Sequence, residues 1–217
     1  MGCLYFFSGF DKDKGFTSEI AKSLQTHIID KKSLLFIASC PYGYEKTDLY
    51  KDGGTSWFRN IGIEFENVDV LDDRKTEAEC LELVNNATAI FLMGGTTLLQ
   101  IEFLKKNNLI SALKLFNGVT LGISAGAINM AVNSFYSADK DCEKTHIYKG
   151  IGLADISIEP HFSIENKGLL DNDIIPFSDV IDIYAMCDDS AILLCNEKLK
   201  YYGNIYLASK RKIEKVH

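Results

Sequence analysis

The chain has 217 residues, close to the largest size that one hydrophobic core organises, so we expect a single domain over residues 1–217. Its 47% hydrophobic and 24% charged residues are typical of a folded globular protein and exclude collagen-like, low-complexity and disordered chains. The net charge of −7 and the lack of an apolar run near the roughly 20 residues of a membrane span lead us to expect neither a nucleic-acid nor a membrane partner.

The N-terminal segment and the cysteines bear on the cellular compartment. The opening residues MGCLYFFSGF lack the basic flank and the small-residue cleavage site of a signal peptide, which predicts a cytoplasmic location. None of the six cysteines is in a C-x-x-C spacing, and several lie in apolar, strand-like runs. We therefore interpret them as buried or incidental thiols, and we expect neither a metal nor a cofactor.

Short apolar runs alternate with helix-like segments from the N-terminus to about residue 133. Runs such as LLFIAS and AIFLM are apolar on both faces, as a parallel sheet covered by helices on both sides requires. The sequence thus predicts an α/β fold with a doubly wound, mostly parallel sheet. The expected strands are CLYFFSG, SLLFIAS, IEFENVDVL, AIFLMGG and VTLGIS, and the expected helices span residues 17–31, 47–60, 76–85, 97–106 and 125–133.

The pattern changes after residue 136, where turn-rich segments separate strand candidates at 152–158, 191–196 and 201–208. A short Glu-Lys-Leu-Lys stretch joins the last two candidates. We therefore expect a C-terminal β-hairpin at an edge of the sheet.

The sharpest motif is GISAG at residues 122–126, a G-x-S-x-G that ends the run VTLGIS and begins the helix-like AGAINMAV. A nucleophile elbow places its serine on such a strand-to-helix turn, where small neighbours are needed because the backbone is strained. The free N–H groups and the positive dipole of the helix N-terminus then point at the serine. Ser124 is therefore the candidate nucleophile, against the plainer interpretation of a glycine-rich turn.

A nucleophilic serine needs a base, and the chain has four histidines. His27 lies in an amphipathic helix, His146 in a polar stretch, and His217 at the end of the chain. His161 differs because it follows an apolar strand and Pro160, at the end of a strand where α/β sheets carry their functional groups. His161 is therefore the candidate general base.

The remaining groups of a triad site are a carboxylate and the donors of an oxyanion hole. The candidate carboxylates are numerous, and composition does not choose among them. The oxyanion donors are easier to place: the N–H of Ala125 follows the nucleophile, and Gly94 and Gly95 end the run AIFLM with no side chain to block a carbonyl. The candidate carboxylates are Asp139, Asp141, Glu143, Glu159, Asp188 and Asp189.

Three motifs carry a family resemblance: MGGTT at residues 93–97, GISAGA at 122–127 and EPHF at 159–162. Their order and spacing resemble those of the peptidase E family of serine peptidases, which contains α-aspartyl dipeptidase and its relative cyanophycinase. The resemblance implies a class I glutamine amidotransferase-like α/β fold. It also implies hydrolysis of small peptides through an acyl-enzyme formed by a Ser-His-acid triad.

In aspartyl dipeptidases the acid lies between the serine and the histidine, and the matching position here is Asp139. Glu159 and Glu143 stay open as the acid of the triad, because the resemblance implies that some family members use Glu at this place. The aspartyl dipeptidases place basic residues a little beyond the histidine to receive the substrate carboxylate, but Lys167 is the only cation in residues 163–176. Arg59 has aromatic neighbours in the sequence, but nothing there places it near the serine. We therefore predict weak or absent aspartyl specificity.

Other functions compete with this interpretation. In a lipase-like α/β-hydrolase the histidine lies far downstream, whereas only 37 positions separate Ser124 from His161. A glutamine amidotransferase needs a cysteine at the elbow, where this chain has Ser124. A small esterase and a non-catalytic small-molecule-binding or sensor domain on the same scaffold remain the alternatives. The expected partner is a small peptide substrate, with a homodimer as a possible assembly.

Overall fold

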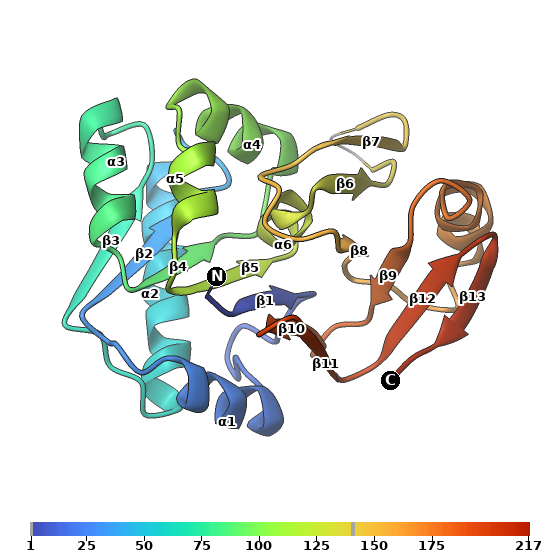
Figure 1. The fold of residues 1–217 in the computed structure, drawn as a ribbon, viewed down its shortest axis with the longest axis horizontal. Helices are drawn as coiled ribbons and strands as arrows, with labels where there is room; N and C mark the ends of the chain where they lie inside the picture. The colour runs from blue at the N-terminus through green and yellow to red at the C-terminus, as the bar shows by residue number, and fades with distance from the viewer. Residues whose placement is uncertain (1, 140–141) are drawn as a thin grey trace.

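The computed structural model describes residues 2–139 and 142–217, and its centre is a sheet of seven strands in the order β11-β10-β1-β5-β4-β2-β3 (Figure 1). Neighbours among the five strands from β1 to β3 in this order run parallel. The predicted α/β fold with a mostly parallel sheet is therefore confirmed. These five strands are β1 Leu4–Phe7, β2 Ser33–Ile37, β3 Asn67–Leu71, β4 Ala89–Leu92 and β5 Val119–Ile123.

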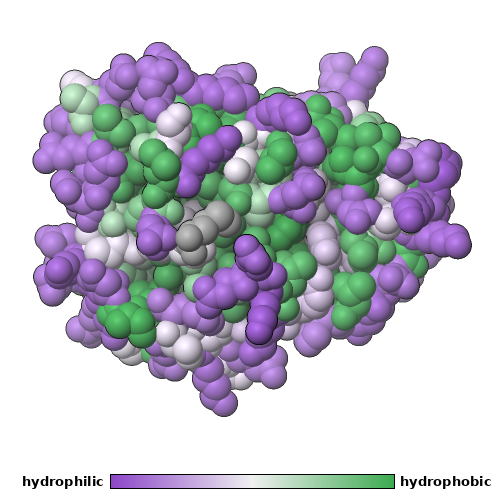
Figure 2. All heavy atoms as spheres, in the orientation of Figure 1, coloured by the Kyte–Doolittle hydropathy of each residue, from purple (hydrophilic) through white to green (hydrophobic). Residues whose placement is uncertain are grey.

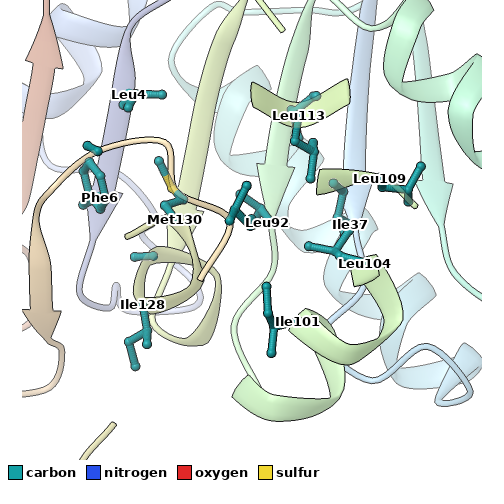
Figure 3. Packing of buried hydrophobic residues seen from close by; sticks show 14 of the residues in the cluster. Leu4, Phe6, Ile37, Leu92, Ile101, Leu104, Leu109, Leu113, Ile128 and Met130 are labelled. Atoms are coloured by element: carbon teal, nitrogen blue, oxygen red, sulfur yellow. The ribbon is translucent and has the colours of Figure 1, made fainter. Parts of the chain in front are cut away.

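Helices cover both faces of this sheet because side chains alternate along each strand. In β1, Tyr5 and Phe7 pack with α1 and α2, whereas Leu4 and Phe6 pack with the helices of the other face. Figure 3 shows Leu4 and Phe6 in this second cluster, with side chains from α4, α5 and α6. The helices are α1 Ser18–His27, α2 Tyr44–Asn60, α3 Glu77–Asn86, α4 Thr97–Lys106, α5 Ile110–Leu115 and α6 Ala125–Met130.

The second half of the chain adds two small sheets beside the main one (Figure 1). One has the order β13-β12-β9-β8, with β8 and β9 parallel, and the other pairs β6 with β7. The additional strands are β6 Asn133–Tyr136, β7 His146–Lys149, β8 Ser157–Glu159, β9 Ile183–Met186, β12 Ile205–Ser209 and β13 Lys212–Lys215. Short helical segments lie between β8 and β9: α7 Lys167–Leu169, η1 Leu170–Ile174 and α8 Ile175–Phe177.

Several expected boundaries are wrong. Helix α1 ends at His27 and α6 ends at Met130, earlier than expected, and α2 begins at Tyr44. The sequence analysis did not predict α5, β6, β7 or β9. These strands have only four residues each, too few for a clear alternation of polar and apolar positions.

The predicted C-terminal hairpin forms the edge of the main sheet from β10 Ala191–Cys195 and β11 Lys198–Tyr202. Its turn is tighter than expected, because Asn196 and Glu197 both have positive φ, 52° and 61°. Two such residues form the turn whose twist matches paired strands. The segment expected as one strand at 201–208 is consequently divided between β11 and β12.

A disulfide joins Cys3 to Cys195, which corrects the expectation that all the cysteines are thiols. Leu4 pairs with Leu194 in the antiparallel ladder of β1 and β10. Cys3, directly before Leu4, therefore faces Cys195, directly after Leu194. This pairing of residues 192 positions apart depends on strand order and has no local signal. The other cysteines, Cys40, Cys80, Cys142 and Cys187, are free thiols.

Hydrophilic residues form much of the outline of the face in Figure 2, with hydrophobic residues visible between them. None of the helices in the described part of the chain is long and apolar enough to cross a membrane. The single domain, the cytoplasmic location and the homodimer stay predictions.

The core packing leads to a stability prediction on two leucines of neighbouring helices. Leu104 in α4 is fully buried, whereas Leu115 in α5 is 83% exposed. Leu104→Ala leaves a cavity in the cluster of Figure 3 and should lower the free energy of unfolding by about 2–5 kcal/mol. Leu115→Ala should change it by less than about 0.5 kcal/mol. Urea denaturation measures both, and equal losses would contradict the described packing.

Candidate functional site

Ser124 lies on a strained turn between β5 and α6, with φ 50° and ψ −115°. The glycines on either side are required by close approaches of the backbone. A Cβ on Gly126 would lie 2.2 Å from the carbonyl oxygen of Leu92, and one on Gly122 would lie 2.6 Å from the sulfur of Met130. The local geometry thus matches the nucleophile elbow that the G-x-S-x-G motif predicts.

His161 follows the short strand β8 and also has a positive φ, 55°. Its Nε2 lies 3.0 Å from Oγ of Ser124, and its Nδ1 lies 2.7 Å from Oδ1 of Asp188. An ionised carboxylate only accepts hydrogen bonds, so Nδ1 carries the hydrogen. In the neutral ring Nε2 then accepts the hydrogen bond from the serine hydroxyl. The structure brings Ser124 and His161 together as expected.

The carboxylate at this imidazole is Asp188 and not Asp139, which corrects the expected position. Each carboxylate oxygen of Asp139 instead lies 3.2 Å from the phenolic oxygen of Tyr136, whose hydroxyl donates a hydrogen bond to the carboxylate. The physical reason is the parallel pairing of β8 with β9, in which Glu159 faces Ala185. This pairing carries the segments that follow the two strands to the same place, and β9 was missing from the predicted elements.

The other candidate carboxylates are placed differently. Glu159 is buried and accepts a hydrogen bond of 2.9 Å from Oγ of Ser137. Burial raises the pKa of the Glu159 carboxyl to about 8; the bond from Ser137 lowers it, and the charges of two nearby aspartates raise it further. Glu159 is therefore mostly protonated at neutral pH. Glu143 and Asp189 are exposed, and Asp141 lies outside the described residues.

Ser8 and Gly9, which follow β1, hold the imidazole and the carboxylate in place, and the sequence analysis missed both. The backbone N–H of His161 donates to Oγ of Ser8 at 2.7 Å. The Ser8 hydroxyl is shared between the carbonyl of Met186 at 3.0 Å and Oδ1 of Asp188 at 3.3 Å. A Cβ on Gly9 would lie 2.6 Å from both Asp188 Oδ1 and His161 Cε1. The sequence signal that could have identified these two residues is a Ser-Gly pair directly after a buried strand.

This support matters because the His161 and Asp188 side chains are 53% and 61% exposed. Water screens the attraction between exposed groups, so an ion pair of this kind contributes little energy by itself. The orientation of the ring therefore depends on the hydroxyl of Ser8 and on the close approach of the Gly9 backbone.

Gly94 and Gly95 follow β4, the strand beside β5, and lie next to the serine. A Cβ on Gly94 would be 3.4 Å from Cβ of Ser124, whereas one on Gly95 would be 2.3 Å from Oγ of Ser39. Ser39 donates to the carbonyl of Gly94 at 2.6 Å, which orients the peptide between the two glycines. Within the described residues, the backbone N–H groups of Gly94, Gly95 and Ala125 have no acceptor.

A cavity of about 620 Å³ opens beside Ser124, between α2 and the ends of β1, β2, β4 and β5. Its lining is mostly aromatic and aliphatic, and among the described lining residues Lys12 is the one group besides His161 that can carry a positive charge. Arg59 and Lys167 are not part of this lining. The lining residues are Gly9, Phe10, Lys12, Phe36, Leu49, Tyr50, Gly53, Gly54, Trp57, Phe91, Met93, Gly94, Gly95, Ile123, Ser124 and His161.

Among the described residues, the ligand atoms of Cys3, His27 and Cys195 come within 4.8 Å of one another, as a metal site would require. The two sulfurs are bonded to each other, however, so neither is a thiolate. Cys3 precedes β1, whereas Ser8 follows it, so this group lies at the other end of the strand from Ser124 and His161.

Comparison with known proteins identifies a family and two similar structures. The model of peptidase family S51 matches residues 6–202. No curated protein matches the chain. A peptidase from an acI-B1 Actinobacterium has a similar crystal structure, with a TM-score of 0.71 and 16% identity over 100% of this chain and 94% of that one. A protein from Listeria monocytogenes EGD-e that is named for peptidase E gives 0.68 and 18%, over 93% and 98%. At these identities the two structures show a shared fold.

Glu159 leads to a pH-dependent prediction. Its ordinary pKa is 4.5, so between about pH 4.5 and pH 8 the folded chain keeps a proton that the unfolded chain releases. The contribution of this group to stability therefore falls as pH rises through that window. Glu159→Gln removes this effect, and its free energy of unfolding relative to wild type should rise by more than about 1 kcal/mol from pH 5 to pH 8.

Urea denaturation at several pH values measures this difference. The exposed Glu143→Gln is the matched control and should show no such trend. A Glu159→Gln difference that does not change with pH would contradict the proposed protonation of Glu159.

Proposed function

The chain belongs to peptidase family S51, a family of serine peptidases, and on this premise we propose that Ser124, His161 and Asp188 form its catalytic triad. The observation that carries the proposal is the run of two hydrogen bonds through the imidazole, 3.0 Å from Ser124 Oγ to Nε2 and 2.7 Å from Nδ1 to Asp188. It joins a nucleophile to a base and the base to an orienting group, as serine peptidases require. The proposed substrates are small peptides.

In the first half of the reaction, Oγ of Ser124 attacks the scissile carbonyl carbon while Nε2 of His161 takes the hydroxyl proton. Asp188 keeps the hydrogen on Nδ1 and stabilises the imidazolium that forms. The imidazolium then gives the proton to the leaving amine as the C–N bond breaks. An acyl-enzyme ester on Ser124 remains.

In the second half, a water molecule attacks the ester carbonyl and gives a proton to Nε2. The tetrahedral intermediate collapses, Ser124 recovers its proton from His161, and the carboxylic acid product leaves. No cofactor is needed for either half.

The oxyanion of both tetrahedral intermediates would be met by the N–H of Ala125 and by that of Gly94 or Gly95. Ala125 is the first residue of α6, where backbone N–H groups have no helical partner. The hydrogen bond from Ser39 to the Gly94 carbonyl supports this role, because it restrains the glycine peptide before the substrate arrives. Preorganised donors of this kind usually make the largest single contribution to lowering the activation barrier of acyl transfer.

We further propose that aspartyl substrates have little advantage. Receiving a substrate carboxylate in an apolar cavity needs a fixed cation or several donors. Lys12 is exposed and stands between Asp11 and Asp13, and its flexible ammonium offers no bidentate fork.

The triad assignment predicts different effects for two aspartates. Asp188→Asn should lower kcat by at least about 10²-fold, because an amide neither holds the correct tautomer nor stabilises imidazolium. Asp139→Asn should stay within a few-fold of wild type, since its carboxylate bonds to Tyr136. Steady-state hydrolysis of a dipeptide panel measures both variants.

Ser124→Ala provides the baseline and should remove both hydrolysis and labelling by a fluorophosphonate probe. Ser124→Ala/His161→Ala should lose no more than Ser124→Ala, because triad members act as a unit. Losses that add, or a larger loss in Asp139→Asn than in Asp188→Asn, would contradict the assignment. An unlabelled wild-type serine would favour a non-catalytic binding domain.

The substrate proposal predicts that kcat/KM for Asp-Leu lies within about tenfold of that for Ala-Leu. The two dipeptides share a leaving residue, so the ratio reports only on the acyl side chain. A larger preference for Asp-Leu would mean that a cation or a set of donors in the site does receive the carboxylate.

A further inference from the structure

Helix α2 presents a notch to the cavity beside Ser124. Tyr50, Gly53, Gly54 and Trp57 all line that cavity, and their spacing of three and four residues places them on one helix face. Two large aromatic residues, two helical turns apart, thus flank a glycine pair that lies one turn from each of them. Because glycine has no side chain, the space between the two aromatic residues is open; we call this space the notch.

The packing of the fold explains only one of the two glycines. A Cβ on Gly54 would lie 2.9 Å from the ring of Phe36, so the close approach of β2 requires glycine there. A Cβ on Gly53 would meet nothing within 4 Å. Glycine inside a helix costs about 1 kcal/mol relative to alanine, so Gly53 costs stability without any packing reason.

Trp57, one aromatic wall of the notch, and the floor of the cavity are held by contacts with the rest of the fold. The indole N–H of Trp57 donates to the carbonyl of Lys12 at 2.8 Å, and its ring packs edge-on against Phe10 and Phe16 at 5.9 and 5.7 Å. Phe36 and Phe91 pack against each other at 5.2 Å where β2 and β4 form the cavity floor. A cavity with fixed walls loses little entropy when a ligand enters it.

The walls are also apolar, with no carboxylate among the described lining residues. Leu49, one of the lining residues, is 68% exposed, although apolar side chains of this size gain free energy when covered. The ammonium of Lys12 lies 5.8 Å from the ring centre of Tyr50, in solvent. The chemistry of the cavity therefore matches a large apolar side chain.

The cavity extends from Ser124 and His161 to α2. The leaving amine must take its proton from His161, whose neighbours Ser8 and Gly9 follow β1. The cavity is lined by Gly9, Phe10 and His161 near the end of β1 and continues past Gly94 to Phe36 and α2. The α2 wall includes neither His161 nor the residues that hold it, and the acyl residue is the part of the substrate that stays on Ser124 after the amine has left.

We propose that this notched cavity binds the acyl residue of the substrate and selects an aromatic or large aliphatic side chain, with Gly53 as the residue that admits it. The proposal rests on the triad function above and adds its substrate class, peptides such as Phe-Leu. Burying the phenyl ring should raise kcat/KM for Phe-Leu at least about tenfold over Ala-Leu.

The first experiment changes the notch. Gly53→Leu fills it with a residue that favours the helix, and should lower the ratio of kcat/KM for Phe-Leu to that for Ala-Leu at least about tenfold. Ser56→Leu adds the same side chain to an exposed position of α2 and should leave the ratio unchanged. A ratio near one in the wild type, or equal ratios in wild type and Gly53→Leu, would overturn the proposal.

The second experiment measures binding without turnover. Trp57 is the only tryptophan of the sequence and lines the cavity, so its fluorescence reports on the notch. In Ser124→Ala, Phe-Leu should change this emission at concentrations at least about tenfold lower than Ala-Leu. Equal titrations for the two dipeptides would overturn the proposed subsite.

The two proposals fail in different ways. If Ser124 is not labelled by a fluorophosphonate and Ser124→Ala retains hydrolysis, the triad function fails, whatever the fluorescence shows. If Ser124 is labelled but Phe-Leu is neither bound nor cleaved better than Ala-Leu, the substrate class alone fails.

Discussion

The hydrogen bond between Nδ1 of His161 and Asp188 is the interaction on which the arrangement of the site depends. It places the ring hydrogen on Nδ1, so the Nε2 lone pair is available to the Ser124 hydroxyl 3.0 Å away. Both side chains of this pair are more than half exposed, so the fold does not hold them by burial. Ser8 fixes them instead, because one hydroxyl contacts the backbone of His161 and the carboxylate of Asp188.

Close backbone approaches explain why glycine is needed on both sides of this interaction. Gly126 lets the elbow lie against β4, and Gly9 lets the end of β1 pass under the imidazole and carboxylate. A methyl group at either position would displace the atoms that must align. The elbow and the imidazole therefore keep their separation through contacts of the main chain, which is stiffer than any contact between exposed side chains.

The site combines a polar side and an apolar side around one serine. His161 and Asp188 lie towards β1 and remain open to water, where protons are exchanged. The aromatic cavity extends from Gly9 and Phe10, after β1, across the ends of β5, β4 and β2 to α2, and an apolar side chain gains free energy by leaving water there. In the proposed reaction, Ser124 would meet a water molecule on the exposed side of His161 and a peptide side chain within the cavity.

The sequence by itself determined the α/β class through the alternation of apolar runs and helix-like segments. It also determined the elbow at Ser124 and the place of His161 at the end of a strand, because each is encoded within one strand and the turn that follows it. Only the tertiary structure decided which carboxylate meets the imidazole. Asp188 and Ser8 reach His161 through β9 and β1, elements 27 and 153 positions away in the chain. The cavity and the disulfide likewise join distant segments. Strand order sets such meetings, and strand order depends on the packing of the whole chain rather than on local spacing.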